Sequence, residues 1–328
     1  MKAKSKRERL EATIAGQPVD RPPVALWRHW PGDDQRGDLL ARATLLFQRT
    51  FDFDFVKVSP SSNYCIAGWG AESRWEGNEE GTRVWGRRAI QTPEDWTRLN
   101  VLDSRQGLLG EVLQALAILG QELGGEVPFI PTIFNPLAQA KNLAGERLLS
   151  DLRQHPEALK AGLETITETT VRFIEAACET GIAGIFLALQ HATHDLLNEA
   201  EYREFGQPYD LRILAVCEDL WFNLLHVHGY NVMFDLAASY PVQAINWHDQ
   251  ETAPSLGEAL QRFPGALVGG LHRWETMLRG TPEQVRADVQ AAIEQTGGHH
   301  YVVGTGCVTF TNTPVGNIWA AREAVERG

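Results

Sequence analysis

Two histidines and a cysteine occupy positions from which their side chains can act together. His226 and His228 are two residues apart at the end of an apolar, strand-like run, so both imidazoles project from the same face. Leu224 shares that face, and in a barrel an apolar residue there points inward. Cys307 lies just beyond the last strand-like run, His300–Gly304. Two imidazoles and one thiolate suit a tetrahedral zinc ion, with a fourth position left for water or a substrate thiol.

A zinc ion in such a site would make a thiol reactive. A free thiol has a pKa near ~8.5 and is mostly protonated at neutral pH, whereas coordination to zinc deprotonates it. Two other interpretations stay open. A His-x-His pair on a strand also serves as a hydrogen-bonded core pair or a substrate clamp, and a lone cysteine near a strand end also serves as a small buried hydrophobe.

The elements that must position these residues form an alternating pattern. Apolar strand-like runs alternate with helical stretches, which is typical of a parallel α/β fold. Eight strands are expected, the number of a (β/α)₈ TIM-type barrel, at Pro23–Trp27, Phe55–Ser59, Val127–Phe134, Gly184–Gln190, Asn223–His228, Ala244–His248, Ala266–Leu271 and His300–Gly304. The longest expected helices are Leu152–Thr180, Glu199–Leu220 and Pro282–Thr296.

Composition and charge narrow the class of protein. No linker rich in Pro, Gly and Ser divides the 328 residues, so one barrel domain over 1–328 is expected, with an insertion around 61–90 that covers the barrel mouth. The net charge of −12 argues against a nucleic-acid partner. The basic start of the chain lacks an apolar signal region, and no apolar run is long enough to span a membrane, so a cytoplasmic protein with free cysteines is expected. No nucleotide cofactor is expected.

Several segments resemble the motifs of the uroporphyrinogen decarboxylase superfamily. They are residues 20–24 (DRPPV) followed by Trp27 and Arg28, residues 225–229 (LHVHG), and the tail 304–307 (GTGC) with 312–314 (NTP). The similarity spans nearly the whole chain and keeps the motifs in order. It implies a (β/α)₈ barrel whose site is built from the loops after the strands. The superfamily includes decarboxylases that act on a tetrapyrrole without a cofactor, and zinc methyltransferases that pass a methyl group between a corrinoid protein and a thiol.

Few of the site residues expected for the decarboxylase branch are present in this sequence. Its motif normally carries two arginines four apart, and only the first is kept, as Arg28, because Gly32 holds the second position. Its pyrrole-binding acid corresponds to Asp54, while Asn142 and Thr305 replace the expected tyrosine and histidine. A ligand with eight carboxylates should meet several arginines, so this pattern weakens uroporphyrinogen as a substrate.

The number of zinc ligands expected for the methyltransferase branch is kept in this sequence. Its zinc ligands are a His-x-Cys pair at the fifth strand and a cysteine in the final motif, and the matching positions are His226, His228 and Cys307. The resemblance therefore implies a Zn²⁺ site of two imidazoles and one thiolate. It also implies a small-molecule, tetrapyrrole or corrinoid substrate, a corrinoid protein as a possible partner, and a homodimer as a possible assembly.

Other polar residues at strand ends complete the expected pocket. Arg28 and Lys57 are expected to hold an anionic group, and His191 and His194 to supply acid–base groups. Asp54, Gln190, His248 and His272 are expected to contact the substrate. The favoured function is a metal-dependent methyltransferase. The alternatives are a cofactor-independent decarboxylase (a lyase) acting on a tetrapyrrole or small acid, and a non-catalytic barrel that binds a tetrapyrrole or corrinoid.

Overall fold

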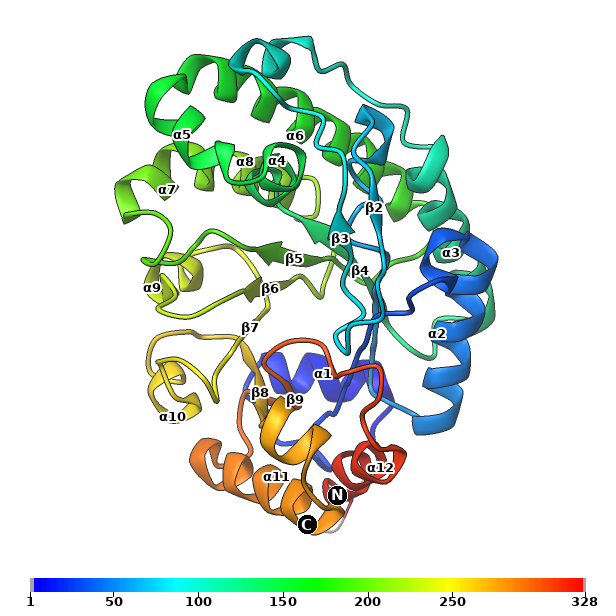
Figure 1. Cartoon of the computed structure of the whole chain (residues 1–328). Helices are drawn as coiled ribbons and strands as arrows, with labels where there is room; N and C mark the ends of the chain where they lie inside the picture. The colour runs from blue at the N-terminus through cyan, green and yellow to red at the C-terminus, as the bar shows by residue number, and fades with distance from the viewer. Residues whose placement is uncertain (1–2, 327–328) are drawn as a thin grey trace.

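The computed structural model describes residues 3–326 and contains a curved parallel sheet that encloses the centre of the molecule (Figure 1). All neighbouring strands of this sheet run parallel, so their carboxyl ends meet at one edge. In sheet order, the strands are β1 (Val56–Val58), β4 (Phe129–Phe134), β5 (Phe186–Leu189), β6 (Leu224–Val227), β7 (Ala244–Trp247), β8 (Ala266–Leu271) and β9 (Tyr301–Thr305).

The sheet has seven regular strands, so the prediction of a regular first strand at Pro23–Trp27 is wrong. That segment nevertheless occupies the eighth position of a TIM-type barrel. Val24 forms a single parallel bridge with Val303 of β9, and its carbonyl accepts a hydrogen bond from the Asp54 amide on the side of β1. Pro23 has no N–H to donate, so a continuous ladder cannot form there.

Helices surround the sheet, as expected for an α/β barrel (Figure 1). The α-helices are α1 (Lys6–Ile14), α2 (Gly37–Phe51), α3 (Gly107–Leu123), α4 (Pro136–Ala144), α5 (Arg147–Gln154), α6 (Pro156–Cys178), α7 (Glu199–Phe205), α8 (Gln207–Ala215), α9 (Phe234–Ala238), α10 (Leu256–Ala259), α11 (Pro282–Thr296) and α12 (Val315–Ala324). Short 3₁₀ turns lie at Asp33–Gln35, Ala67–Trp69 and Pro93–Arg98, and a π-helical turn at Arg273–Leu278. None of the described helices is long and apolar enough to cross a membrane.

Helix boundaries follow local signals. The predicted helix Pro282–Thr296 is α11 residue for residue, because the Thr281 side chain caps its first turn and Gly297 adopts the left-handed conformation that ends it. The other two predicted helices are each divided. His155-Pro156 separates α5 from α6, and Gly206 separates α7 from α8.

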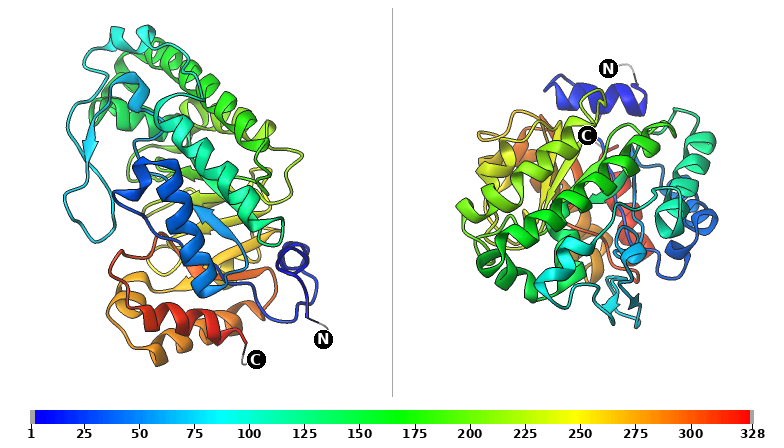
Figure 2. Two further views of the ribbon diagram at one scale, coloured as in Figure 1. Left: turned by 90° about the vertical axis from the view of Figure 1, so that its right-hand side faces the viewer. Right: turned by 90° about the horizontal axis from the view of Figure 1, so that it is seen from above.

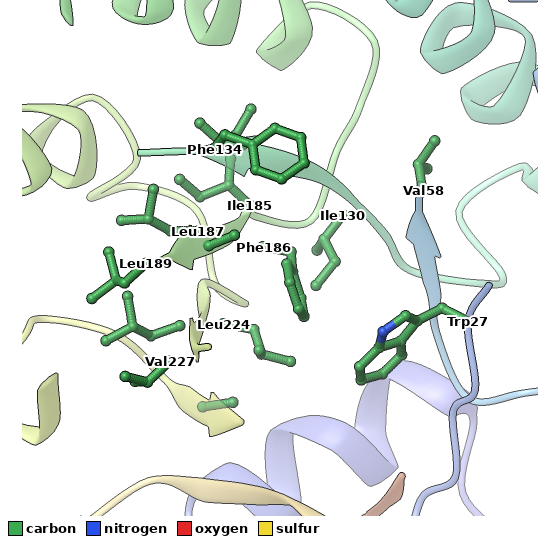
Figure 3. Close-up of a cluster of buried hydrophobic side chains, with 14 of the residues drawn as sticks. Trp27, Val58, Ile130, Phe134, Ile185, Phe186, Leu187, Leu189, Leu224 and Val227 are labelled. Atoms are coloured by element: carbon green, nitrogen blue, oxygen red, sulfur yellow. The ribbon is translucent and has the colours of Figure 1, made fainter. Parts of the chain in front are cut away.

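The interior of the barrel is filled by large apolar side chains. Figure 3 shows Phe186 of β5 extending toward Trp27, whereas Leu187 and Leu189 lie on the other side of the strand. This is the alternation expected of a strand. The rings of Trp27 and Phe186 are 5.5 Å apart, and Phe186 in turn stacks on His226 at 5.3 Å between ring centroids. The polar site described below therefore packs against aromatic side chains of the barrel interior.

The two ends of the barrel differ in their coverings. Helix α1 lies at one end, and the two-stranded ribbon of β2 (Ser73–Arg74) and β3 (Val84–Trp85) lies at the other (Figure 2). The tip of this ribbon, residues 78–82, rests on the loop after β9. There the amide and hydroxyl of Thr311 both donate to the carbonyl of Glu79, at 2.8 and 2.9 Å.

Candidate metal centre and substrate cavity

Four side chains of types that can bind a metal ion meet at the carboxyl edge of the sheet. His226 lies near the end of β6 and His228 directly follows that strand, while His248 directly follows β7. Because His226 pairs with Asn246 in the parallel register of β6 and β7, both strands deliver their next same-face residue to the same place. Cys307 arrives from the loop after β9. The ligand atoms of His226, His228, His248 and Cys307 all lie within 4.8 Å of one another.

Hydrogen-bond distances show how tightly the group is packed. His248 Nε2 is 3.3 Å from His228 Nδ1, and His228 Nδ1 is 3.9 Å from Cys307 Sγ. His226 and His248 are buried, while His228 and Cys307 are partly exposed toward the cavity. The arrangement therefore combines a protected wall with one accessible side.

The orientation of His226 is set by Asn246. Asn246 Nδ2 donates to the carbonyls of Val268, at 2.7 Å, and Thr305, at 3.1 Å. These two bonds turn the amide oxygen toward His226, where Oδ1 accepts from Nδ1 at 2.6 Å. Nδ1 therefore carries the proton and Nε2 keeps its lone pair. A neutral imidazole held in this way is the state that binds a metal ion.

Charge within the group favours a thiolate. Burial raises the pKa of the Cys307 thiol, but the polar contacts with the three imidazoles of His226, His228 and His248 outweigh burial and bring that pKa well below its ordinary value. For His248, burial alone would lower the pKa of the imidazole. Its hydrogen bonds to Cys307 and Glu251 outweigh burial and raise that pKa to about 9. The two shifts together favour a thiolate at Cys307 beside a protonated His248.

Glu251 extends this network away from the cluster. Its carboxylate oxygen Oε2 lies 3.4 Å from His248 Nδ1 and accepts a hydrogen bond from the Tyr230 hydroxyl at 3.0 Å. A carboxylate on the far nitrogen of a histidine fixes the ring and raises the basicity of the nitrogen that faces the site.

A cavity of about 110 Å³ opens beside the cluster. Its walls combine aromatic and small side chains with a few polar groups: Trp27, His29, Lys57, Ser62, Glu80, Thr82, Thr132, Phe134, Phe186, Ala188, Gln190, His226, His228, Cys307 and Val308. Such a mostly apolar pocket with a few convergent polar groups is typical of a small-molecule site.

Lys57 is the cationic group of this cavity. Its ammonium is buried, donates to Ser59 Oγ at 3.1 Å and lies 4.6 Å from the centre of the Phe186 ring. Burial lowers the pKa of Lys57 to about 7, partly opposed by the negative charge of Cys307. Among the residues lining the cavity within 3–326, it is the only lysine or arginine. Lys57 is thus positioned to contact one anionic group on a ligand.

Gln190 and His191 lie next to each other at the end of β5. Gln190 lines the cavity, as expected of a substrate contact. His191 is buried, and its Nδ1 makes no hydrogen bond among the described residues. His194 differs, because its side chain is exposed and only its amide is engaged, with the carbonyl of Asn231. The structure therefore does not bring His191 and His194, the two predicted acid–base groups, into one cavity.

Two further predicted residues lie away from the cavity. The buried carboxylate of Asp54 precedes β1, at the opposite end of the strand, where it pairs with Arg9 at 2.6 Å and Arg21 at 2.7 Å. His272 Nδ1 lies 3.1 Å from the carboxylate of Asp288 in α11. The predicted substrate contacts through Asp54 and His272 are corrected on this ground, because both side chains are committed to structural partners.

Arg28 is also displaced from its expected place. Its guanidinium lies over the ring of Trp30, at 4.9 Å, and lines a narrow pocket against α2. The main cavity does not include it. An anion clamp formed jointly by Arg28 and Lys57 is therefore not what this structure supports.

Sequence reasoning assigned His248 to substrate binding and did not include it in the metal cluster. The signal was present, since Asn246-x-His248 at the end of β7 repeats the spacing of His226-x-His228 at the end of β6. Glu251 and Glu80 had no such signal. Glu251 lies on a turn, and Glu80 enters the cavity from the distant ribbon tip.

Curated relatives fall in both branches of one family. The chain is 22% identical over 329 residues to the methylcobamide:CoM methyltransferase MtbA of Methanosarcina acetivorans, covering 95% of each chain. It is 27% identical over 334 residues to a uroporphyrinogen decarboxylase of Xanthomonas axonopodis pv. citri, covering 92% of this chain and 89% of that one.

The fold has a near match among solved structures. A methyltransferase from Methanosarcina mazei superposes with a TM-score of 0.86 at 20% identity, and 98% of each chain is covered. At that identity the likeness shows the barrel fold alone. The sequence also matches the family model described as uroporphyrinogen decarboxylase (URO-D) over residues 5–328. The chain belongs to the uroporphyrinogen decarboxylase (URO-D) family.

Proposed function

We propose that this chain is a zinc-dependent methyltransferase that moves a methyl group between a corrinoid and a thiol or related acceptor. The observation that carries the proposal is the convergence of three imidazoles and one thiolate within 4.8 Å at the barrel mouth. The likeness to a methylcobamide:CoM methyltransferase over nearly the whole chain supports it.

The donor set fits a zinc ion. Nitrogen and sulfur donors in fourfold arrangements are what zinc takes in proteins. His226 is held as the neutral tautomer by Asn246, and the pKa of Cys307 is already low before any metal binds. His226, His228 and Cys307 would hold the ion, and His248 is positioned either to join them or to give way to a substrate.

A bound zinc ion supplies the positive charge that keeps a coordinated thiol deprotonated at neutral pH. The chain's own residues do the rest. Trp27, Phe134 and Phe186 form an apolar wall that limits water, and the Lys57 ammonium holds an acidic group of the acceptor at the other side of the cavity. Asn246 and Glu251 keep two of the imidazoles in their binding orientation.

Decarboxylation of uroporphyrinogen receives less support from this geometry. Within 3–326, the cavity offers one lysine and no arginine to a ligand with many carboxylates, and about 110 Å³ suits a smaller molecule. Asp54, the expected pyrrole-binding acid, is tied to Arg9 and Arg21 at the other end of the barrel. A barrel that only binds a tetrapyrrole would not need a preformed thiolate.

Zinc content of the tag-free protein tests the proposal, with wild type compared with Cys307→Ala. We expect close to one equivalent in the wild type and a loss in the variant. Cys178→Ala is the matched control, because this partly exposed thiol lies on α6, far from the cluster in the fold. Demethylation of methylcobalamin by added thiol, followed by its absorbance, should then depend on Cys307. Well under one equivalent of zinc in the wild type would overturn the proposal.

A further inference from the structure

Two opposite charges line the cavity beside the metal cluster. Lys57 lies on β1, and Glu80 enters from the tip of the β2–β3 ribbon. Among the cavity-lining residues of 3–326, Glu80 is the only carboxylate, just as Lys57 is the only lysine or arginine. Lys57 forms no ion pair with any described carboxylate, and its ammonium donates only to Ser59 Oγ. The cavity therefore presents a positive and a negative group from two different elements.

Glu80 is held at the cavity wall by Arg273. Its Oε1 accepts a hydrogen bond from Arg273 Nη2, and within the described chain this is the one hydrogen bond that the carboxylate makes. The Arg273 guanidinium is buried against the ring of Phe310, at 4.8 Å, and does not line the cavity. An arginine partner keeps a carboxylate ionised. Because the Glu80 side chain is 38% exposed, a ligand in the cavity can contact this carboxylate without contacting the guanidinium.

His29 lies next to the ribbon tip on the same cavity wall. A Cβ on Gly81 would be 2.8 Å from His29 Cβ, so the ribbon backbone packs directly on this residue. The His29 ring lines the cavity, and neither of its nitrogens makes a hydrogen bond to another residue of 3–326. Burial lowers the pKa of His29 to about 4, and the charge of Lys57 adds to the effect, which favours a neutral ring. A neutral imidazole can accept a hydrogen bond, as the Glu80 carboxylate can.

The distance from Lys57 to the metal cluster suits a short ligand. The Phe186 ring separates them, since its centre lies 4.6 Å from the Lys57 ammonium and 5.3 Å from the centre of the His226 ring. A cavity of about 110 Å³ likewise suits a small molecule. The wall thus offers a metal cluster for sulfur, an ammonium for an acid, and the pair Glu80 and His29 for a protonated amine.

We propose that the methyl acceptor is a small α-amino acid thiol, whose carboxylate contacts Lys57 and whose ammonium contacts Glu80 and His29. This inference rests on the proposed function and names the substrate class of that same site. Formation of the S–C bond leaves the electron pair of the broken Co–C bond on the cobalt of the methylcorrinoid and releases the thiol proton. The product is therefore an S-methyl amino acid.

Calorimetric titration with S-methyl-L-cysteine tests this recognition without zinc–thiolate binding or turnover. Two analogues each lack one charged group: 3-(methylthio)propionate has no ammonium, and 2-(methylthio)ethylamine has no carboxylate. We expect S-methyl-L-cysteine to bind about tenfold or more tightly than either analogue, because each missing group removes a charge-assisted hydrogen bond.

Two variants assign the two contacts. Glu80→Gln should lose the preference for S-methyl-L-cysteine over 3-(methylthio)propionate, while the affinity for 3-(methylthio)propionate itself stays unchanged. Lys57→Met should lose the preference over 2-(methylthio)ethylamine. Glu76→Gln is the matched control, because Glu76 belongs to the same ribbon but does not line the cavity, and it should keep both preferences.

Two results of these titrations would overturn the proposal. One is equal affinity of the wild type for S-methyl-L-cysteine and 3-(methylthio)propionate. The other is a preference that survives Glu80→Gln, or an equal loss of affinity for all three ligands in that variant, which would mean that the ribbon closes the cavity without contacting an ammonium.

Zinc content and turnover separate a failure of this inference from a failure of the proposed function. Zinc-loaded protein that demethylates methylcobalamin as fast with 3-mercaptopropionate as with L-cysteine would keep the proposed function and overturn only the acceptor class. Wild-type protein without zinc would overturn the proposed function and the acceptor role with it.

Discussion

Asn246 orients part of the candidate metal centre although it is not one of the four possible ligands. Its side-chain amide nitrogen donates hydrogen bonds to the carbonyls of Val268 and Thr305, and its amide oxygen accepts a hydrogen bond from His226. The residue thus ties β7 to β8 and β9 and fixes one imidazole. We predict that Asn246→Leu lowers zinc affinity by about 10- to 100-fold and costs about 1–3 kcal/mol of unfolding free energy.

A matched variant separates the two effects of Asn246→Leu. Asn223 is also buried, and it accepts from the Ile185 amide at 3.1 Å and donates to the Cys217 carbonyl at 3.0 Å, but it precedes β6 at the other end of the barrel. Asn223→Leu should cost similar stability in urea unfolding while zinc affinity, measured by competition with a chelator, stays unchanged. Equal zinc affinity in both variants would remove Asn246 from the site.

The protonation of His248 decides whether it is a metal ligand. With a pKa raised to about 9, it stabilises the metal-free fold below about pH 6.5, and this contribution is lost as pH rises through about 9. A metal ion needs the neutral ring. We therefore predict that zinc binding at pH 7.5 releases the His248 proton, and that affinity increases as pH approaches 9.

Calorimetric titration of zinc in two buffers of different ionisation enthalpy counts the protons released. His248→Gln should release about one proton fewer than the wild type, since the Cys307 thiolate contributes little of its own. An unchanged proton count would mean that His248 remains charged and bonded to Glu251, and that the fourth position belongs to the substrate.

At the scale of elements, Gly306 allows the loop after β9 to reach β7. A Cβ on this residue would lie 2.7 Å from His248 Cα and 2.7 Å from the Trp247 carbonyl oxygen, closer than atoms can approach. The absence of a side chain therefore lets Cys307 stand beside His248. We predict that Gly306→Ala displaces the loop and weakens zinc binding by about tenfold or more, with a stability cost of about 1–3 kcal/mol.

Gly257→Ala is the control for that substitution. In α10, a Cβ on Gly257 would have its nearest neighbour, the Gln295 carbonyl oxygen, at 3.7 Å, which is ordinary contact. This variant should keep its zinc and gain stability, because alanine favours a helix over glycine. Retention of full zinc affinity by Gly306→Ala would show that the loop can adapt.

Elements were predictable from sequence where local signals set them. The Thr281 cap and Gly297 define α11 without help from the rest of the fold. The segment Pro23–Trp27 was expected to be a strand because it is apolar, but proline removes a donor and leaves a single bridge. The alternation of strand-like and helical runs predicted a parallel sheet, the eight runs predicted a barrel, and the family resemblance implied the same fold.

The site was partly predictable for the same physical reason. Spacing on one strand placed His226 and His228 on one face, and closure of the barrel brought Cys307 to them. Asp54 and His272 were misplaced because their partners, Arg9 and Asp288, are distant in sequence and no local pattern announces them. Side-chain direction at a strand end depends on such partners.

At the scale of the whole molecule, the β2–β3 ribbon acts as a strap across the barrel mouth. Glu80 at its tip lines the cavity and pairs with Arg273, which is buried after β8 and lies 4.8 Å from the ring of Phe310. The neighbouring Glu79 accepts from Asn312 Nδ2 at 3.2 Å. Loops that follow strands far apart in sequence thus hold one strap in place beside the cavity.

The Glu80–Arg273 pair should therefore control how often the strap opens. We predict that Glu80→Gln increases amide hydrogen exchange across residues 76–84 by roughly fivefold, since a half-exposed ion pair contributes about 1 kcal/mol. Glu76→Gln is the matched control, because within residues 3–326 Glu76 forms an ion pair only with Arg74, inside the ribbon, and its loss should leave the exchange of the tip unchanged. If the two variants exchange alike, the hydrogen bonds of Glu79 to the loop after β9 hold the strap without the ion pair. In that case the mouth opens by movement of both loops together.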